Sequence, residues 1–472
     1  MNLSTFKVLS DSEILQIHEA TLDILENCGV KIGSPEVFSF LQAKGFPVDT
    51  EKQIVRLPRT AIAEALSHAP AQFEVFDREG KFAYILGDGN SKIAAGHNAV
   101  FWVDSETGET RYSKVADVEL FSRLCDKLEY IDMIGIPVMP QDVPDPRNTL
   151  PYGVRAVVEN SRKPIFFSTD NARINRAIIN LAEAAFAGDF RSQVYGITQL
   201  SPTSPLFWEG GVLEAILDTI KTAVPLAILP EPNAGLSCPY TLAGLLTVNN
   251  AECISGLAMI QMLKPGTKVL YANSWTVTDM RDATALVGST ETTICRVAGA
   301  QLARFYHVPC HTTAPNSDNH AHDEQNAWEK TFSMFCSVGA GNDLIVNCGM
   351  FATGMTCSHE QLIMDEEISA MSKRIAEGVL VTPETLATDL IKQIGPRGDY
   401  MLTEHTLSRL RGKEFLPPRV SVRTSRASWE AAGRKDTYQM AREQVCRLSK
   451  TAGSPIDAPR AAKLAEIIQG LN

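Results

Sequence analysis

The chain has 472 residues, of which 44% are hydrophobic and 21% are charged, and its net charge at pH 7 is −11. These proportions are typical of globular proteins and exclude a disordered chain. The acidic balance, with no basic stripe, argues against nucleic-acid binding and against docking on anionic membranes. We therefore expect a folded protein whose partners include neither nucleic acid nor a membrane.

Residues 1–130 have the pattern of an α+β region that caps the rest of the chain. Ser10 or Ser12 precedes apolar residues at helical spacing, and Gly29 suits the left-handed residue that ends such a helix. Short β-rich runs follow at 73–76, 83–86 and 93–104. We predict an N-terminal cap over residues 1–130.

A regular alternation of apolar runs and helical segments begins at residue 131. The runs are rich in β-forming residues and occupy residues 131–140, 164–170, 194–202, 225–232, 268–275, 308–315 and 343–351. Their spacing of roughly 30–43 residues matches one strand–helix unit each. Seven such units predict a (β/α)8 barrel of the TIM type over residues 131–415, with a doubly wound sheet as the competing fold. The position of the eighth strand is left open.

Residues 416–472 are predicted to form a C-terminal helical tail. Pro417 and Pro418 separate this segment from the barrel, and residues 428–448 are amphipathic. In a (β/α)8 barrel the chemistry lies at the carboxyl ends of the strands, where Pro, Asn, Ser and Thr gather in this sequence.

Cysteine usage and hydropathy point to a cytoplasmic protein. Ten cysteines lie far apart with no CxxC pair, and the first residues lack the charged and apolar regions of a signal peptide. The most apolar stretches, 242–263 and 332–357, are interrupted by residues such as Glu252 and Asp343 that are costly in lipid. We expect no membrane span.

Several common catalytic motifs are missing. The chain has no GxGxxG after a strand, no GxxxxGK[ST], no GxSxG and no HExxH, which disfavours nucleotide-binding, serine-hydrolase and zincin chemistry. One loop is nevertheless rich in possible metal ligands: His307, Cys310, His311, His320, His322 and Asp323. These residues could bind zinc, although their spacing matches no standard pattern, and a metal-free polar loop is the alternative.

Aromatic residues near the predicted strand ends form a second group. They are Phe167, Phe207, Trp208, Tyr271, Trp275 and Phe351, with Phe101 and Trp102 from the cap. Such residues usually pack within a barrel, but several facing one mouth would form a cage for a quaternary ammonium. Neutral side chains at strand ends could hold a substrate carboxylate: Gln199, Asn233, Asn273 and Asn316. The residues alone predict a cytosolic barrel enzyme without specifying its reaction.

Longer segments, spread over nearly the whole chain, are more specific. They are LSDSEILQIHEATLDILENCGVKI, PLAILPEPNAGLSCPYTLAGLLTVNNAECISGLAMIQMLKPGTKVLYANSWTVTDMR, GSTETTICRVAGAQLARFYHVP, GAGNDLIVNCGMFATGMTCSHEQLIMDEEI, GPRGDYMLTEHTL and WEAAGRKDTYQMAREQV. Together they resemble the trimethylamine methyltransferase family of corrinoid-dependent methyltransferases. Where that family has a variant of T-D-S-K-x-P-D-x-Q, this chain keeps Asp318, Asp323 and Gln325 but adds His320 and His322.

The resemblance implies a reaction. The trimethylamine enzymes of the family carry an amber-encoded pyrrolysine, whereas this chain contains only standard residues and so resembles the non-pyrrolysine branch, whose characterised members demethylate quaternary amines. The implied enzyme transfers a methyl group from a betaine-type amine, with glycine betaine or proline betaine as the first candidates, to cob(I)alamin on a partner corrinoid protein. A neutral tertiary amine then leaves without a proton donor. Neither a covalent protein nucleophile nor a metal or tightly bound cofactor in this chain is expected.

This reaction gives each candidate residue a predicted role. We predict an ammonium cage of Trp275, Tyr271 and Phe351, and a carboxylate site of His97, Gln199, Asn273 and His320. Barrels of this kind commonly associate through their outer helices, so we expect a homo-oligomer. Two alternatives stay open: a zinc-dependent methyltransferase or lyase that uses the loop from His307 to His322, and a betaine-binding barrel without turnover.

Overall fold

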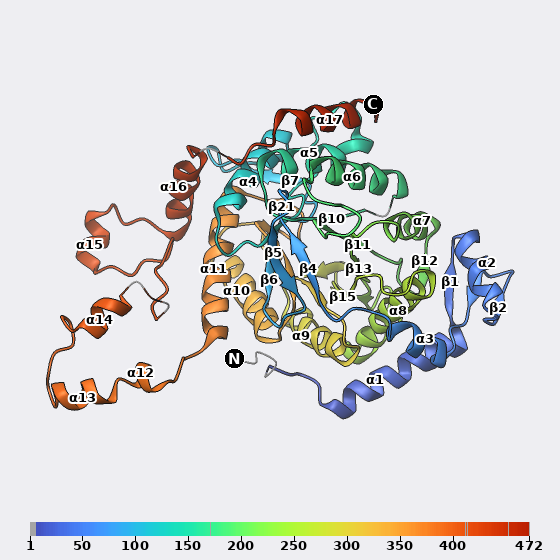
Figure 1. Cartoon of the computed structure of the whole chain (residues 1–472), viewed down its shortest axis with the longest axis horizontal. Coiled ribbons are helices and arrows are strands. Elements are labelled where there is room, and N and C mark those ends of the chain that lie inside the picture. The colour runs from blue at the N-terminus through green and yellow to red at the C-terminus, as the bar shows by residue number, and fades with distance from the viewer. Residues whose placement is uncertain (1–5, 170, 411, 413, 452, 472) are drawn as a thin grey trace.

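The fold is built around a closed parallel barrel (Figure 1). The computed structural model describes residues 6–169, 171–410, 412, 414–451 and 453–471. The barrel strands, in spatial order, are β6 (Lys92–Ala95), β9 (Met133–Ile134), β10 (Ile165–Ser168), β11 (Gly196–Leu200), β13 (Leu226–Ile228), β15 (Val269–Asn273), β18 (Cys310–Thr313) and β19 (Leu344–Cys348). Parallel pairing of β19 with β6 closes the barrel. The predicted (β/α)8 barrel is therefore confirmed, and the doubly wound alternative is wrong.

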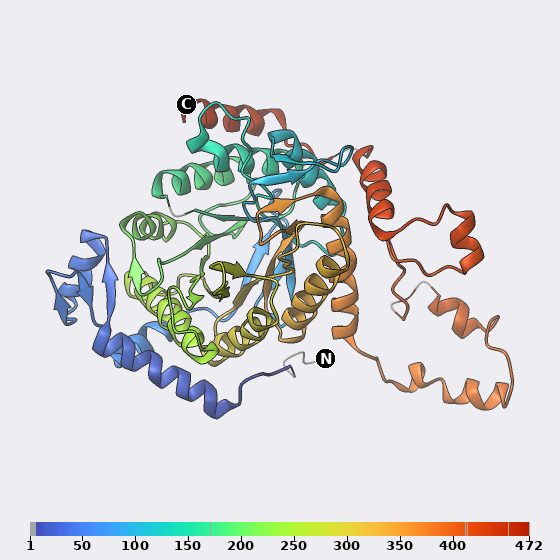
Figure 2. The same ribbon diagram turned by 180° about the vertical axis from the view of Figure 1, so that it is seen from behind.

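One long helix follows each strand and covers the barrel, as Figure 2 shows from the opposite side. These helices are α4 (Val115–Lys127), α5 (Thr149–Asn160), α6 (Ala172–Ala185), α7 (Gly210–Thr219), α8 (Leu242–Leu263), α9 (Thr290–Phe305), α10 (Glu324–Gly339) and α11 (His359–Glu377). Each turns an apolar stripe inward. In α6, for example, Ile174, Ile178 and Leu181 are buried at the i, i+4, i+7 spacing of one helix face.

The barrel strand that the sequence left unplaced is β6. Each of the seven predicted runs contains one of the other strands, but β6 lies in the run at 93–104 that we assigned to the 1–130 cap. The strand is only four residues long. Two further strands, β7 (Phe101–Val103) and β8 (Thr110–Tyr112), separate it from α4, so no strand–helix alternation is visible in the sequence. The barrel sheet therefore begins at Lys92, before the predicted start at residue 131.

The residues before β4 form a small α+β unit docked on one side of the barrel. Its elements are α1 (Asp11–Asp23), a π-helical turn at Ile24–Cys28, β1 (Val30–Ile32), α2 (Pro35–Ala43), β2 (Val48–Asp49), β3 (Ile54–Val55) and α3 (Arg59–Leu66). A capping box between Ser10 and Glu13 begins α1. The unit is tied to the barrel because β1 pairs in parallel with β12 (Phe207–Trp208).

A hairpin of β4 (Phe73–Phe76) and β5 (Phe82–Leu86) closes the amino-terminal end of the barrel. The Phe76 N–H donates to the Val194 carbonyl at 2.8 Å, just before β11. Its apolar side chains continue the core inside the barrel, where Phe166 and Leu270 lie. With this end plugged, only the carboxyl end of the barrel is left for a site.

Helix α8 is buried on both sides, which explains its unusual hydrophobicity. Within the part of the chain that the structure describes, it is the one helix long and apolar enough to cross a membrane, and 78% of its most apolar window is buried inside the protein. It packs between the strands β13 and β15 and the helices α1 and α3. Such a helix is apolar all round because it has no solvent face.

The chain beyond α11 leaves the barrel and then returns to it. Residues 379–418, which we call the arm, contain α12 (Pro383–Leu386), α13 (Thr388–Ile394) and α14 (Glu404–Arg409) and stand off the barrel beside α11 (Figure 1). The rest contains α15 (Arg426–Ala431), α16 (Thr437–Ser449), which packs on α11 and α4, and α17 (Ala458–Gln469), which packs on α6 and α5. The arm lies outside the barrel, although most of it falls within the predicted barrel segment, 131–415.

Candidate active site

A cavity of about 670 Å³ lies at the carboxyl ends of the barrel strands. All eight strands, or the loops that follow them, contribute to its wall: His97, Asn98, Met139, Ser168, Thr169, Gln199, Ser201, Glu231, Asn233, Ser274, Thr276, Thr313, Asn316, Asn347 and Met350. Its rim includes Met355, which is 46% exposed, so the cavity reaches the surface there. In (β/α)8 enzymes this end of the barrel carries the chemistry, which makes the cavity the candidate active site.

One side of the cavity, which we call the donor wall, is a chain of hydrogen bonds between neutral groups. Asn98 Nδ2 donates to Ser168 Oγ at 2.8 Å, and Ser168 Oγ lies 3.2 Å from His97 Nε2. His97 Nδ1 lies 3.2 Å from Asn347 Oδ1, and Asn347 Nδ2 donates to Asn316 Oδ1 at 2.8 Å. All these bonds are satisfied when the Ser168 hydroxyl donates to His97 Nε2 and His97 Nδ1 donates to Asn347.

The donor wall is uncharged but can still bind an anion. Burial lowers the pKa of His97 to about 4, against the opposing effect of its hydrogen bond to Asn347, so the imidazole is neutral near pH 7. Each amide nitrogen carries two hydrogens, and the bond between Asn347 and Asn316 uses one of the Asn347 pair. The wall therefore retains N–H groups that can donate hydrogen bonds to the oxygen atoms of a ligand.

The opposite side, the acceptor wall, presents oxygen atoms. Gln199 lies in β11 and Glu231 follows β13, and these strands lie across the barrel from β19 and β6. The two walls meet at Ser168, which is paired in register with Gln199. Glu231 projects into the cavity, and among the described residues its carboxylate has no hydrogen-bond partner. The Glu231 side chain is exposed to the cavity, but the surrounding walls keep most bulk water away from it. This desolvation raises the pKa of the Glu231 carboxyl to about 7. The buried Gln199 Oε1 also has no partner.

The charge of the cavity favours a cation at the acceptor wall. Glu231 is the one ionisable acid or base besides His97 among the described lining residues, which include neither Lys nor Arg. They also include no Phe, Tyr or Trp. An ammonium group bound here would therefore be held by carboxylate and amide oxygens, without an aromatic cage.

Two residues of the predicted carboxylate site line the cavity, one on each wall: His97 and Gln199. Asn233 and Asn316, which the sequence also offered as neutral polar groups, line it as well. Asn233 Oδ1 accepts the Thr278 hydroxyl proton at 2.5 Å. The sequence therefore identified polar members of both walls but did not separate the two walls.

The structure places Tyr271, Asn273 and Trp275 outside the cavity. Alternate residues of a strand face opposite sides, and in β15 the inner positions belong to Leu270 and Ala272. Tyr271 instead donates its hydroxyl proton to Asn250 Oδ1 at 3.1 Å, towards α8. Asn273 Oδ1 accepts from Thr312, and Trp275 is buried in the same outer core as Tyr271.

The other two predicted residues, Phe351 and His320, also lie outside the cavity. Phe351 is buried against Val103, and its ring is tilted by 51° against that of His322, with ring centroids 4.6 Å apart. His322 in turn contacts Tyr438 of α16 at 4.9 Å. His320 is exposed. These side chains build the rim between the barrel and α16.

The histidine loop is not gathered into a metal site. No group of three or more His, Cys, Asp or Glu side chains with metal-binding geometry occurs in the described ranges. Cys310 Sγ donates to Asn342 Oδ1 at 2.9 Å, and the buried ring of His311 lies against Phe166, with centroids 5.2 Å apart. The zinc hypothesis thus gains no geometric support.

Sequence reasoning missed Glu231, Asn98, Ser168 and Asn347. Ser168 ends β10, Asn347 is next to last in β19, and Asn98 and Glu231 come three residues after β6 and β13. Position near a strand end was therefore the available signal. The sequence reading favoured aromatic residues, and so it passed over the acidic residue in PLAILPEP. Asn98 and Asn347 also adopt positive φ values of 59° and 128°, a conformation that asparagine tolerates better than most residues.

A buried ion pair holds the donor wall from behind. Lys330 Nζ lies 3.0 Å from Asp365, with both side chains fully buried. Lys330 also donates to the carbonyls of Pro315 and Met350, and Asp365 accepts from the Gly349 N–H at 2.6 Å. The pair therefore joins α10 and α11 to the loops that carry Asn316 and Met350.

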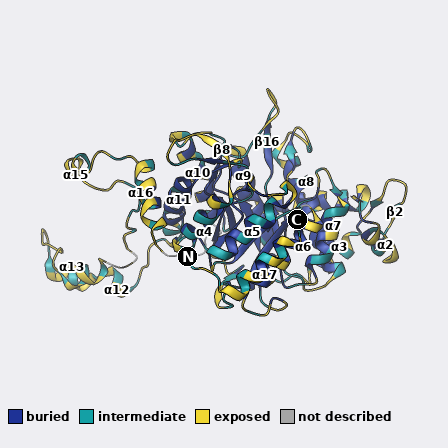
Figure 3. Ribbon diagram, turned by 90° about the horizontal axis from the view of Figure 1, so that it is seen from above, coloured by how far each residue is buried: buried dark blue, intermediate teal, exposed yellow. Residues whose placement is uncertain are grey.

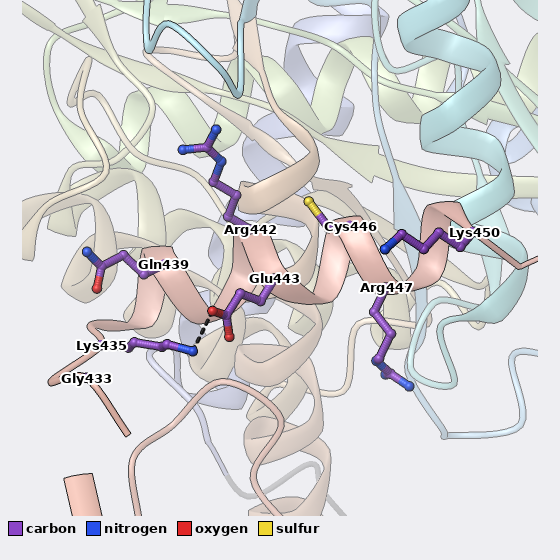
Figure 4. A pocket seen from close by; sticks show the side chains of 8 residues that line it. All are labelled: Gly433, Lys435, Gln439, Arg442, Glu443, Cys446, Arg447 and Lys450. Carbon is purple, nitrogen blue, oxygen red and sulfur yellow. Dashed lines mark ion pairs between the residues drawn. The ribbon is translucent and has the colours of Figure 1, made fainter. Parts of the chain in front are cut away.

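A second hollow lies on α16, on the outer surface (Figure 4). Its lining residues are Gly433, Lys435, Gln439, Arg442, Glu443, Cys446, Arg447 and Lys450. Lys435 is paired with Glu443 at 2.5 Å, and both side chains are well exposed. The hollow is a shallow surface feature formed largely by one helix, and we assign it no chemistry.

The chain matches one protein family over nearly its whole length. The family model for trimethylamine methyltransferase (MTTB) matches residues 1–470. Trimethylamine methyltransferase MttB of Desulfitobacterium hafniense is 30% identical over 463 residues, which cover 98% of this chain and 93% of that protein. The protein of the same name from Methanosarcina thermophila is also 30% identical, covering 97% and 96%. A glycine betaine methyltransferase of Desulfitobacterium hafniense is 27% identical over 443 residues, covering 93% and 91%.

Solved structures share the fold. Monomethylamine methyltransferase (MtmB) of Methanosarcina barkeri aligns with a TM-score of 0.51 at 12% identity, covering 94% of this chain and 89% of that one. A hydroxylamine complex of MtmB aligns with a TM-score of 0.54 at the same identity and coverage. At this level of identity the likeness extends to the fold alone.

Proposed function

Because the chain belongs to the trimethylamine methyltransferase family, as its sequence segments predicted, we propose that it removes a methyl group from a quaternary amine of the betaine type. The acceptor is cob(I)alamin held by a partner corrinoid protein. The observation that carries the proposal is the polarity of the cavity, with Glu231 on one wall and neutral N–H donors on the other. The glycine betaine methyltransferase among the relatives supports the same substrate class.

Glu231 binds the ammonium end. A quaternary nitrogen carries a permanent charge but no N–H, so it requires a nearby anion and oxygen atoms that its polarised methyl groups can approach. Glu231 supplies the anion, and Gln199 Oε1, which is buried without a partner, supplies one of the oxygens. This assignment replaces the aromatic cage that the sequence predicted.

The donor wall binds the carboxylate end. Asn98 and Asn347 offer amide hydrogens from the far side of the barrel, and Asn316 offers them from the loop after β18, between that side and Glu231. Neutral donors orient the carboxylate without forming a tight ion pair, so the product can leave. A zwitterion therefore spans the cavity, and trimethylamine, which lacks a carboxylate, uses one wall only.

The protein residues hold the substrate in position and exclude water from the site. They form no covalent bond with the substrate. Cob(I)alamin, presented by the corrinoid protein, supplies the nucleophile that accepts the methyl group. The leaving tertiary amine is neutral and needs no proton. Holding one N-methyl towards the opening, near Met355 and Gly354, is then the main task of the cavity walls. An opening at the surface fits an acceptor carried by a second protein.

An anaerobic spectroscopic assay tests the proposal. The purified protein is mixed with its cognate corrinoid protein, reduced to the Co(I) state, and with glycine betaine, proline betaine, carnitine, choline or trimethylamine. We expect the methyl-cobalt spectrum with a betaine, a weaker response with choline, which lacks the carboxylate, and none with trimethylamine. No methyl transfer from any quaternary amine would disprove the proposal. Calorimetric binding of a betaine without transfer would favour a betaine-binding barrel, and stoichiometric zinc in the protein would favour the zinc-dependent alternative.

A further inference from the structure

The arm, residues 379–418, exposes large apolar side chains along its whole length. None of its described residues is buried, and Figure 3 shows its helices in the colours of exposed and intermediate residues. The exposed apolar side chains are Val379, Leu380, Val381, Leu386, Ile391, Tyr400, Met401, Leu402, Leu407, Leu410 and Phe415, with exposures from 38% to 82%. Apolar surface of this extent marks a contact site in soluble proteins.

Both ends of the arm are fixed to the barrel. Arg374 of α11 donates to the Gly378 carbonyl at 2.8 Å. At the other end the Arg419 N–H donates to Glu367 at 2.9 Å, and Val420 is buried. The arm is therefore a loop with anchored ends, which lowers the entropy lost when its middle is ordered against a partner.

A matching apolar surface lies on the barrel helix next to α11. On α10, Trp328, Phe332 and Phe335 follow one another at i, i+4, i+7 spacing, with exposures of 55%, 65% and 38%. We call these three residues the aromatic stripe. The charged residues of this part of the helix are engaged elsewhere, since Lys330 is fully buried and Glu329 accepts from Ser317.

The chemistry of the two surfaces is alike. The arm contains five Lys or Arg against five Asp or Glu, so it has no net charge within a chain of −11. An uncharged apolar segment suits an uncharged aromatic surface, and it suits neither nucleic acid nor an anionic membrane. Eleven large side chains, each more than a third exposed, present apolar area on the order of the roughly 800 Å² per partner that a stable interface buries.

We propose that the arm of one copy covers the aromatic stripe of a second copy, and that the second arm covers the first stripe. The arm leaves from α11 and the stripe lies on the adjacent α10, so a twofold axis beside these helices makes both contacts at once. The stripe is on the side of the barrel, whereas the cavity opens at the carboxyl ends of the strands. The second copy therefore leaves the cavity accessible.

Sedimentation of the full chain and of matched variants tests this pairing. Leu402→Glu with Leu407→Glu breaks the arm, and Phe332→Glu with Phe335→Glu breaks the stripe; all four positions are exposed, so the fold should persist by circular dichroism. We expect the wild-type chain to be a dimer or an assembly of dimers. Either double variant should raise the dissociation constant at least about thirtyfold, as loss of central interface residues does. Leu236→Glu, an exposed position outside both surfaces, should change nothing.

Mixing the two variants identifies which surfaces meet. The variant with substitutions in the arm retains an intact stripe, and the variant with substitutions in the stripe retains an intact arm. One intact contact can therefore form between the two variants. We expect an equimolar mixture to regain a dimer that neither variant forms alone. A mixture that stays monomeric would mean that the arm and the stripe do not bind each other and would overturn the pairing, and a single variant that stays dimeric alone would point to arm-to-arm or stripe-to-stripe contact. A monomeric wild-type chain, or dimeric double variants, would overturn it as well.

Discussion

The two walls of the cavity are built on different physical principles. On the donor wall His97, Asn347 and Asn316 form one continuous hydrogen-bonded chain. On the acceptor wall Glu231 has no hydrogen bond among the described residues, and Gln199 Oε1 is buried without one. A carbonyl buried without a partner costs stability, and the Glu231 carboxylate faces the cavity without a counter-charge. Their presence in one place indicates that a ligand completes this wall, whereas the donor wall is organised in advance.

The largest expected effect comes from breaking the support of the donor wall. Lys330→Met leaves Asp365 charged and buried without its partner, and we expect a loss of about 3–5 kcal/mol in unfolding free energy. Urea unfolding measures this loss. Lys373→Met is the control, because its ion pair with Asp132 is partly exposed and should cost less than about 1 kcal/mol. Equal losses in the two variants would show that the buried pair does not hold the wall.

On the acceptor wall, Glu231→Gln removes the anion with little change in shape. We expect the affinity for glycine betaine to fall by about 2 kcal/mol, roughly thirtyfold, because a cation in an enclosed site loses its counter-charge. Isothermal calorimetry provides the measurement. Glu252→Gln is the matched control: its pKa is also raised to about 7 by burial, but it accepts from Ser204 outside the cavity. Unchanged affinity in Glu231→Gln would remove Glu231 from the ammonium site.

The pH dependence of betaine affinity should reflect the ionisation of one group, the Glu231 carboxyl of the acceptor wall. Burial raises the pKa of Glu231 to about 7, and the ammonium requires the ionised form, so affinity should rise with pH through about 7 and fall up to about tenfold per unit below it. His97, with a pKa lowered to about 4, stays neutral across this range. Binding measured from pH 5.5 to 8.5 should therefore follow one titration, and Glu231→Gln should flatten it. A flat wild-type profile would contradict this role.

The smallest effect is expected where the sequence had placed the cage. Tyr271→Phe removes two buried hydrogen bonds, the one its hydroxyl donates to Asn250 and the one it accepts from Asn249. We expect a cost of about 1–2 kcal/mol in unfolding free energy and no change in betaine affinity. Thermal unfolding and calorimetry on the same sample separate the two outcomes. Weaker betaine binding in a stable variant would return Tyr271 to the site.

The sequence predicted the barrel because continuous apolar strands alternate with helices at a regular spacing, and it failed at β6, where a four-residue strand and a following hairpin hide that alternation. For the site, strand-end polarity indicated Gln199, Asn233 and Asn316, and all three line the cavity. The sequence does not show which face of β15 points into the barrel, because both faces of this buried strand are apolar. The inward residues are Leu270 and Ala272. Tyr271, which the sequence assigned to the cage, lies on the outer face of this strand, towards α8.

Closure of the barrel through β6 has a consequence for how the chain folds. Leu344 pairs with Lys92, and Lys31 of the first strand pairs with Phe207, so key contacts join residues that are far apart along the chain. Such a high contact order slows folding, because long loops must close before these contacts form. During synthesis the free edges of β6 and β18 stay unpaired until β19, which bonds to both, emerges from the ribosome. A nascent chain that stalls before residue 344 would therefore carry an open sheet with unpaired edges, the state most prone to aggregation.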